Sequence, residues 1–344
     1  MMRLPLFEFR APKSLDEAAR ILDGEGPQAM PLAGGTDLLP NMKRRQQVPK
    51  TLLSLRGIAE LSSVHIGKDE SGSRFGACVT LSELANDPRL RNGLSALAQA
   101  ASFVATPQIR NMATLGGNLC LDTRCNYYDQ NYEWRKAIDF CLKKDGETCW
   151  VAPGSAKCMA VSSTDTAPAL MALGARVRLV SSAGEREIAL TEFYRSDGQF
   201  YLTRQPNEIL AEVLLEPLHG WKSTYWKLRR RGSFDFPVLS VAAAVRLGSG
   251  GGVEDARIVI GSAGSRPLVA ADAARTLTGR VLDAHSIAEA ALLAARIAKP
   301  LDNTDFDMSW RKKVTAEFVS YALRELHGED LSKERLSFTH TSLV

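Results

Sequence analysis

The stretch PLAGGTDLLPNMK (residues 31–43) joins an apolar start to two glycines and a Thr-Asp pair. This order predicts a strand that runs into a turn and then into a short helix. A second stretch, TLGGNL (residues 114–119), again combines two glycines with a hydroxyl residue and an amide. Glycine lets the backbone approach a ligand closely, so either turn could hold a phosphate in a nest of N–H groups, or could be a plain turn. Neither has the spacing of a Rossmann fingerprint or a Walker A loop.

Local signals around these stretches predict alternating strands and helices in the N-terminal third. Ser14 and Glu17 have the capping-box spacing of a helix start. Residues 91–105 carry apolar and alanine residues at helical spacing, and that helix should end before Pro107. Residues 109–121 are interpreted as a strand or turn around the paired glycines.

A chain of 344 residues exceeds the size at which a single core usually stops growing, which predicts more than one domain. We expect a first domain at residues 1–175 with a cysteine-rich insertion at about 121–162. A second domain at 176–330 combines strand-like and helical segments, and residues 331–344 are interpreted as a tail. The expected class is α+β.

Composition narrows the range of partners and locations. The net charge of +4 is spread thinly, so nucleic acid is not expected as a partner. The N-terminus lacks the apolar core of a signal peptide, and no stretch has the eighteen or so apolar residues of a membrane span. A cytoplasmic location is the expectation, and there a cysteine cluster favours metal binding or catalysis over disulfides.

Five of the six cysteines lie within 39 residues, and only Cys78 lies elsewhere. Four of the five are separated by 15, 7 and 8 residues: Cys125, Cys141, Cys149 and Cys158. Four thiolates suit one tetrahedral zinc or one [4Fe–4S] cluster, and this spacing matches the common signatures of neither. The residues alone leave the two open.

The ordered set of motifs resembles the FAD-binding subunit of molybdenum hydroxylases of the xanthine dehydrogenase and carbon monoxide dehydrogenase type. The resemblance covers roughly residues 4 to 325. It is carried by the following segments: PLAGGTDLLPNMK (31–43), PQIRNMATLGGNL (107–119), DTAPALMALGA (165–175), YWKLRRRGSFDFPVLSVAAAVRL (225–247) and ARIVIGSAGSRPL (256–268). It implies a two-lobed α/β FAD-binding domain, as in the xanthine dehydrogenase and vanillyl-alcohol oxidase folds. A smaller α+β domain with an antiparallel sheet and helices would follow it.

The resemblance also implies which residues bind FAD. The first turn would wrap the pyrophosphate and the second would meet the phosphates and the flavin side. An aspartate after the second turn would bond FAD, a lysine would approach the isoalloxazine ring, and an aliphatic residue would pack on it. The matching residues are Leu32, Ala33, Gly34, Gly35, Thr36, Asp37, Leu38, Leu39, Thr114, Leu115, Gly116, Gly117, Asn118, Asp165, Lys227 and Ile209.

The chain departs from ordinary members of that family between the second turn and the aspartate. There, 46 residues separate Asn118 from Asp165, where the family has a handful. The inserted segment carries Cys125, Cys141, Cys149 and Cys158, while Cys120 lies at its base. In a family built for electron transfer, redox-inert zinc would add nothing to electron flow, which favours a [4Fe–4S] cluster on these four.

One branch of the family, the 4-hydroxybenzoyl-CoA reductases, resembles this combination of FAD and an extra cluster. That resemblance implies an electron-transfer subunit working with a molybdenum-cofactor subunit and a [2Fe–2S] subunit in a dimer of heterotrimers. A ferredoxin-like donor would supply electrons for reductive dehydroxylation on a partner subunit.

Two alternatives stay open. The chain could be the FAD subunit of an oxidising molybdenum hydroxylase whose loop binds zinc or makes contacts. It could also be a non-catalytic scaffold with a zinc-stabilised loop.

Overall fold

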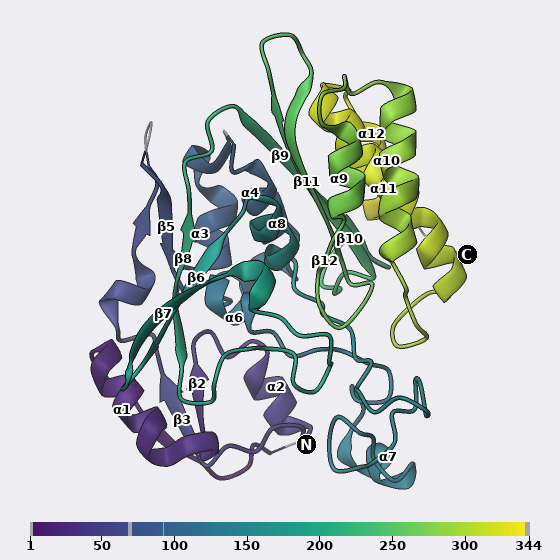
Figure 1. Cartoon of the computed structure of the whole chain (residues 1–344). Helices are drawn as coiled ribbons and strands as arrows, with labels where there is room; N and C mark the ends of the chain where they lie inside the picture. Colours follow the sequence, from purple (N-terminus) through teal and green to yellow (C-terminus); the bar gives the residue numbers. More distant parts are fainter. Residues whose placement is uncertain (1–2, 68–70, 92, 341–344) are drawn as a thin grey trace.

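The computed structural model describes residues 3–67, 71–91 and 93–340 (Figure 1). Met1 and Met2 lie outside the described residues. The same holds for residues 341–344 of the expected tail.

A three-stranded parallel sheet in the order β1-β3-β2 opens the fold. Residues 31–43 have the expected order, since the strand β2 runs into a turn that leads to a short helix, α2. The elements of this part are β1 (Glu8–Arg10), α1 (Leu15–Glu25), β2 (Ala29–Leu32), α2 (Leu38–Lys43) and β3 (Thr51–Ser54). Ser14 caps α1 by accepting the Glu17 amide, as its spacing predicted.

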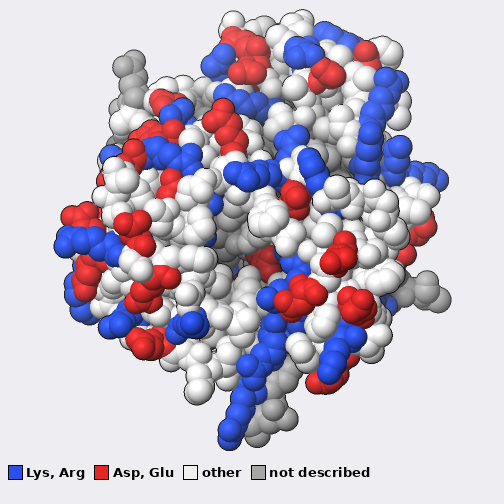
Figure 2. All heavy atoms as spheres, turned by 60° about the horizontal axis from the view of Figure 1, so that its bottom comes forward, with Lys and Arg blue, Asp and Glu red and all other residues white. Residues whose placement is uncertain are grey.

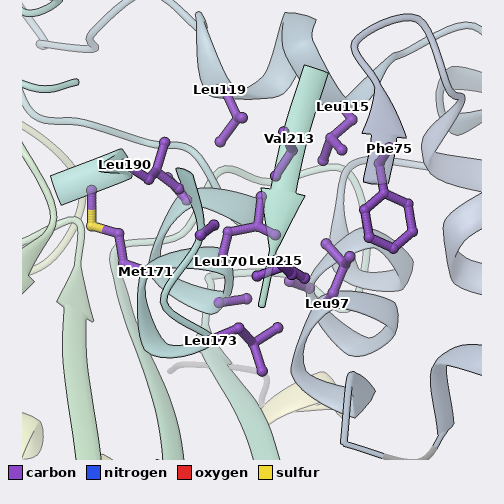
Figure 3. Close-up of a cluster of buried hydrophobic side chains, with 14 of the residues drawn as sticks. Phe75, Leu97, Leu115, Leu119, Leu170, Met171, Leu173, Leu190, Val213 and Leu215 are labelled. Atoms are coloured by element: carbon purple, nitrogen blue, oxygen red, sulfur yellow. The ribbon is translucent and has the colours of Figure 1, made fainter. Parts of the chain in front are cut away.

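A five-stranded antiparallel sheet in the order β4-β5-β8-β6-β7 forms the second lobe. Its strands are β4 (Val64–His65), β5 (Ser73–Gly76), β6 (Arg176–Ser181), β7 (Gly184–Ala189) and β8 (Ile209–Leu215). Its helices are α3 (Leu81–Asn86), α4 (Ser95–Phe103), α5 (Pro107–Arg110), α6 (Leu115–Leu119) and α8 (Thr166–Ala172). Figure 3 shows the core between them, where Leu97, Leu170 and Val213 come from two helices and a strand.

This sheet passes the expected domain boundary near residue 176. That boundary falls between α8 and β6, whereas the sheet continues to Leu215 because β8 pairs with β5 as well as with β6. The change to the next sheet comes between Leu215 and Trp221. Pairing between strands more than a hundred residues apart leaves no local pattern in the sequence.

A four-stranded antiparallel sheet in the order β12-β11-β10-β9 builds the C-terminal part. Its strands are β9 (Trp221–Leu228), β10 (Leu239–Leu247), β11 (Val253–Gly261) and β12 (Leu268–Val269). Its helices are α9 (Ala271–Leu277), α10 (Ala284–Ile297), α11 (Met308–His327) and α12 (Ser332–His340). In Figure 1 these helices lie together beside the sheet, while α8 of the preceding lobe also contacts β10 and β11. The C-terminal sheet is therefore packed against its own helices and against α8 of the second lobe.

The part of the expected tail that the structure describes is the helix α12. Arg335 on this helix pairs with Glu325 at 2.5 Å and donates to the Tyr225 carbonyl at 3.1 Å. Its guanidinium also lies 4.1 Å from the Trp226 ring centroid. These contacts hold α12 against β9.

Mixed helices and sheets in the two N-terminal lobes and in the antiparallel C-terminal part confirm the expected α+β class. No helix formed by the described residues has the length and hydropathy needed to cross a membrane. The face turned forward in Figure 2 carries both charge signs interspersed, in keeping with the net charge of +4, and it is hollowed near its centre.

Candidate functional site

A cavity of about 360 Å³ lies where the first lobe, the second lobe and the C-terminal part meet. The first turn and α2 line it on one side, and the second turn, β8 and the segment 234–236 line it on others. Glycine backbone, apolar side chains and a few charged groups share the lining. A cavity of this kind suits an extended, partly apolar ligand with a charged segment.

The first turn presents free backbone donors to this cavity. Among the described residues, no hydrogen bond uses the amides of Gly34, Gly35 or Thr36. A Cβ at Gly34 would overlap the Met112 carbonyl oxygen, and Gly35 has a φ of +71°. Both positions therefore require glycine, and the three free amides are suited to phosphate oxygens.

The second turn is arranged differently. Residues 115–119 form the helix α6 rather than the expected strand or turn, and Thr114 caps it by accepting the Gly117 amide at 3.1 Å. The amides of Leu115 and Gly116 donate to the carbonyls of Val79 and Ala77 at 2.9 and 2.8 Å. A Cβ at Gly116 would lie 2.6 Å from that of Ala77. Gly116 thus serves close packing, and the Thr114 hydroxyl can still donate to a ligand in the cavity.

Asn118 closes the neck of the inserted segment. Its Oδ1 accepts from the Thr164 hydroxyl at 2.8 Å, and from the amide and hydroxyl of Thr166 at 3.0 and 2.7 Å. Asn118 lines the cavity, and so does Asp165 between the two threonines. The two ends of the insertion thus lie next to each other, and the second glycine turn lies beside Asp165.

Asp165 belongs to a buried polar network in the cavity wall. Its carboxylate pairs with Lys227 Nζ at 3.0 Å and accepts from the Tyr225 hydroxyl at 2.7 Å. Burial raises the pKa of Asp165, against the opposing effect of Lys227, and burial lowers the pKa of Lys227. Lys227 also donates to the Phe103 carbonyl at 2.9 Å. It does not line the cavity itself and is connected to it through Asp165.

The cavity brings most of the expected FAD residues together. Those that line it are Leu32, Ala33, Gly34, Gly35, Thr36, Asp37, Leu38, Thr114, Gly116, Gly117, Asn118, Asp165 and Ile209. Leu115 is instead a fully buried core residue, and Leu39 packs over the backbone of Gly35. The backbone and side chains present thus fit a bound dinucleotide.

Several cavity residues were missed by the sequence reasoning. Cys120 and Asp122 follow the second turn directly, so their position next to it could have indicated them. Tyr201 and Arg204 lie in a loop before β8, and Phe236 comes from the C-terminal part. No sequence pattern marks these three.

The inserted loop, residues 121–162, contains four buried cysteines with free thiols. Cys125, Cys141 and Cys158 share one small apolar cluster with Tyr128 and Ala160. Burial raises the pKa of Cys125 to about 12 and that of Cys158 to about 11. Cys120, outside this cluster, is packed against the core of the second lobe.

The four thiols do not form a closed metal site in this arrangement. Within residues 3–67, 71–91 and 93–340, no group of three or more His, Cys, Asp or Glu side chains is placed to hold a metal ion. The donor set has the chemistry of a four-thiolate centre, and its geometry is looser than such a centre requires.

A buried ion pair connects the loop to the cavity wall. Lys143 Nζ lies 2.7 Å from each of Asp122 Oδ1, Thr123 Oγ1 and the Gly198 carbonyl. The Tyr128 hydroxyl donates to the other Asp122 oxygen at 2.9 Å. All three protons of the ammonium therefore have acceptors, as a buried lysine requires.

The C-terminal part holds the loop from the other side. The Asn126 amide donates to the Asn303 carbonyl at 3.0 Å, and Asn303 Nδ2 donates to the Met159 carbonyl at 2.6 Å. Asn126 and Met159 directly follow Cys125 and Cys158. Asn303 thus ties together the two backbone segments that carry these cysteines.

Comparison with known proteins agrees with this geometry. Residues 5–216 match the family described as FAD binding domain in molybdopterin dehydrogenase. Residues 223–326 match the CO dehydrogenase flavoprotein C-terminal domain. The two matches meet between β8 and β9, at the change of sheet.

Relatives and solved structures match over most of the chain. The aldehyde oxidoreductase FAD-binding subunit PaoB of Escherichia coli is 34% identical over 72% of this chain and 79% of its own length. The carbon monoxide dehydrogenase medium chain of Afipia carboxidovorans is 29% identical over 92% and 95%. The structure of reconstituted CO dehydrogenase from Oligotropha carboxidovorans superposes with a TM-score of 0.78 at 25% identity, covering 96% of this chain and 100% of that one. On these matches, the chain belongs to the family of FAD-binding subunits of the molybdopterin dehydrogenases.

Proposed function

We propose that this chain is the FAD and iron–sulfur subunit of a molybdenum enzyme of the 4-hydroxybenzoyl-CoA reductase type. The observation that carries the proposal is a loop with four buried free thiols inserted beside the flavin cavity of an FAD-binding subunit. Cys125, Cys141, Cys149 and Cys158 are the proposed ligands of a [4Fe–4S] cluster. Cys78 and Cys120 are excluded because both lie outside the loop.

The chemistry of the loop supports a metal centre. Cys125, Cys141 and Cys158 share one buried cluster, and Cys149 is buried in the same loop. Four thiols buried together without a metal or a disulfide have no evident packing advantage over apolar side chains. Thiolates that bind a metal, in contrast, order the segment that carries them, because ligation and folding are coupled.

At the flavin cavity, this chain's residues bind and orient the cofactor. The free amides of Gly34, Gly35 and Thr36 would hold the pyrophosphate, and Ile209 would pack against the ring. Asp165 would accept a hydrogen bond, held in place by Tyr225 and Lys227. FAD exchanges electrons singly or in pairs, whereas a [4Fe–4S] cluster carries one at a time.

The proposed direction of flow is from a ferredoxin-like donor through the loop and the flavin toward a [2Fe–2S] subunit and a molybdenum-cofactor subunit. The reaction on the partner subunit takes up an electron pair and two protons, removes the phenolic hydroxyl as water and yields benzoyl-CoA. A dimer of heterotrimers is the proposed assembly. A cytoplasmic location fits, because a reducing compartment keeps the thiols free.

A second candidate has support from the relatives. Those compared include subunits of aldehyde, carbon monoxide, nicotinate and xanthine oxidising enzymes, so the chain could serve an oxidising hydroxylase with a zinc-binding or purely structural loop. The zinc-stabilised scaffold has less support, because the cavity has the glycine cradle and free amides that a flavin needs.

Iron, acid-labile sulfide, zinc and flavin quantitation of the purified complex tests the proposal, together with EPR after dithionite reduction. We expect one FAD and about four irons per chain, and a reduced-cluster signal separate from those of the [2Fe–2S] subunit. Zinc or no metal at this loop, with FAD present, would favour the oxidising hydroxylase.

A further inference from the structure

The inserted loop contacts the N-terminal end of α2, the helix that directly follows the first glycine turn. The Asp122 amide donates to Asp37 Oδ2 at 3.2 Å, and the Arg124 guanidinium pairs with the other Asp37 oxygen. Asp37 is the N-cap residue of α2 and follows Thr36 of the turn. The base of the loop is therefore fastened one residue from the free amides.

The loop also contacts the other end of α2. Gln46 Nε2 donates to the Tyr128 carbonyl at 2.5 Å, and Arg135 Nη2 donates to the Arg44 carbonyl at 2.9 Å. Because α2 is held at both ends, a displacement of the loop must either move this helix or break these hydrogen bonds.

Lys143 fixes the loop in the position that makes these contacts. It lies between Cys141 and Cys149 in sequence, yet its ammonium is buried against Asp122 at the cavity wall, with 5% of each side chain exposed. The ammonium also lies 4.8 Å from the Tyr128 ring centroid and 5.3 Å from that of Tyr201. Asp122 and Tyr201 line the cavity. One charge thus joins the cysteine-bearing segment, the loop base and the flavin cavity.

We propose that Lys143 is a positioning residue that couples the order of the inserted loop to flavin binding at the first turn. The inference rests on FAD binding at the cavity and does not need a metal in the loop. The connection runs from Lys143 to Asp122, from the Asp122 amide to Asp37, and from Asp37 into the turn. The first two steps are an ion pair and a hydrogen bond between buried or half-buried groups, and the last is the peptide bond between Asp37 and Thr36.

Coupling of this kind is reciprocal. If the ordered loop favours the arrangement of α2 that binds FAD, then FAD must favour the ordered loop by the same factor. A residue that only stabilised the loop would change its order equally with and without FAD. The dependence on FAD therefore separates positioning from simple support.

The test is hydrogen exchange of residues 121–162 in the full-length chain, with flavin removed and with FAD restored. Lys143→Met removes the charge and keeps much of the side-chain volume. The double variant Lys143→Met with Asp122→Asn avoids an uncompensated buried carboxylate if the single variant folds poorly. Lys136→Met, at an exposed lysine on α7 (Tyr132–Ala137), is the matched control.

In the unmodified chain and the Lys136 control we expect FAD to slow exchange in the loop by about 5-fold or more, the lower end of usual coupling factors. In the Lys143 variants this factor should fall close to one, with weaker FAD binding. Equal FAD protection in the double variant, or no FAD protection in the unmodified chain, would overturn the proposal.

Iron measured in the same samples separates this inference from the proposed function. A chain without iron that keeps the Lys143-dependent protection would reject the cluster and support the coupling. An iron-loaded chain whose loop exchanges hydrogen at the same rate with and without FAD would reject the coupling and leave the proposed cluster in place.

Discussion

The flavin cavity and the cysteine loop lie side by side, but different interactions hold them. The cavity walls are built from β2, α2, α6 and β8, which are helices and strands held by backbone hydrogen bonds. The loop has little regular structure beyond the short helix α7, and it depends on side-chain contacts such as Lys143 with Asp122. The cavity thus rests on regular secondary structure, whereas the loop rests mainly on side-chain contacts with its surroundings.

The thiols show what metal binding must overcome. Burial raises the pKa of Cys125 and Cys158 well above that of a free cysteine, so both are protonated at neutral pH without a metal. Ligation would replace these protons with metal charge.

The largest expected effect falls on the cavity alone. Gly34→Val would place a side chain where the Met112 carbonyl lies, and it should displace the first turn and reduce FAD occupancy more than 10-fold. The iron of the loop should remain. Gly154→Val is the matched control, because a Cβ there meets no atom within 4 Å. Flavin and iron per chain after desalting provide the measurement, and full FAD occupancy in the Gly34 variant would refute the assignment of the turn.

Cys141→Ser should affect the loop and largely spare the cavity. We expect loss of about four irons per chain and faster proteolysis within residues 121–162, because ligation orders the loop. FAD should stay bound, with affinity lowered only by the coupling between the two sites.

Cys120→Ser, outside the ligand set, should retain the iron. A Cys141 variant with unchanged iron content and an unchanged EPR signal would show that the proposed ligand set is wrong. A Cys120 variant that loses the iron and the EPR signal would show the same.

Lys227→Met tests the rigid wall of the cavity. It leaves the Asp165 carboxylate buried without its cation, and loss of one partner of a buried pair costs about 3–5 kcal/mol of unfolding free energy. Urea denaturation measures the loss. Lys222→Met, at an exposed lysine on the same strand, should change stability by less than about 0.5 kcal/mol. A loss below about 1 kcal/mol for Lys227→Met would show that this pair does not support the wall.

The smallest expected effect is on the hydrogen bonds by which Asn303 of the C-terminal part holds the loop. Asn303→Ala removes the hydrogen bond to the Met159 carbonyl, which is worth about 1 kcal/mol. Hydrogen exchange should rise around Cys125 and Cys158 and stay unchanged at the first turn. Asn207→Ala, which loses only a surface hydrogen bond to Asp23, is the control. Equal exchange in both variants would remove Asn303 from the contacts that order the loop.

Much of the fold could be predicted from local sequence. The strand–turn–helix at residues 29–43 follows from glycine conformation, and the Ser14 cap of α1 and the capping box of α3 follow from unpaired amides at helix starts. At α1 the box is not closed, because the Glu17 carboxylate accepts from the Lys13 amide instead of the Ser14 amide. The second turn could not be predicted in this way. Two glycines disfavour a helix, and α6 forms because Leu115 and Gly116 bond to the segment 77–79.

The sequence by itself determined the composition of both sites: two glycine turns, an aspartate, and four cysteines confined to one insertion. Only the tertiary structure decided how they meet. Asn118 bonds to Thr164 and Thr166 across the insertion, and Lys143 reaches back to Asp122 at the cavity. Local periodicity records which face of an element is buried, but it does not record which distant residue a buried polar group will pair with. That choice is made when the lobes pack together, because each buried charge and amide must find a partner there.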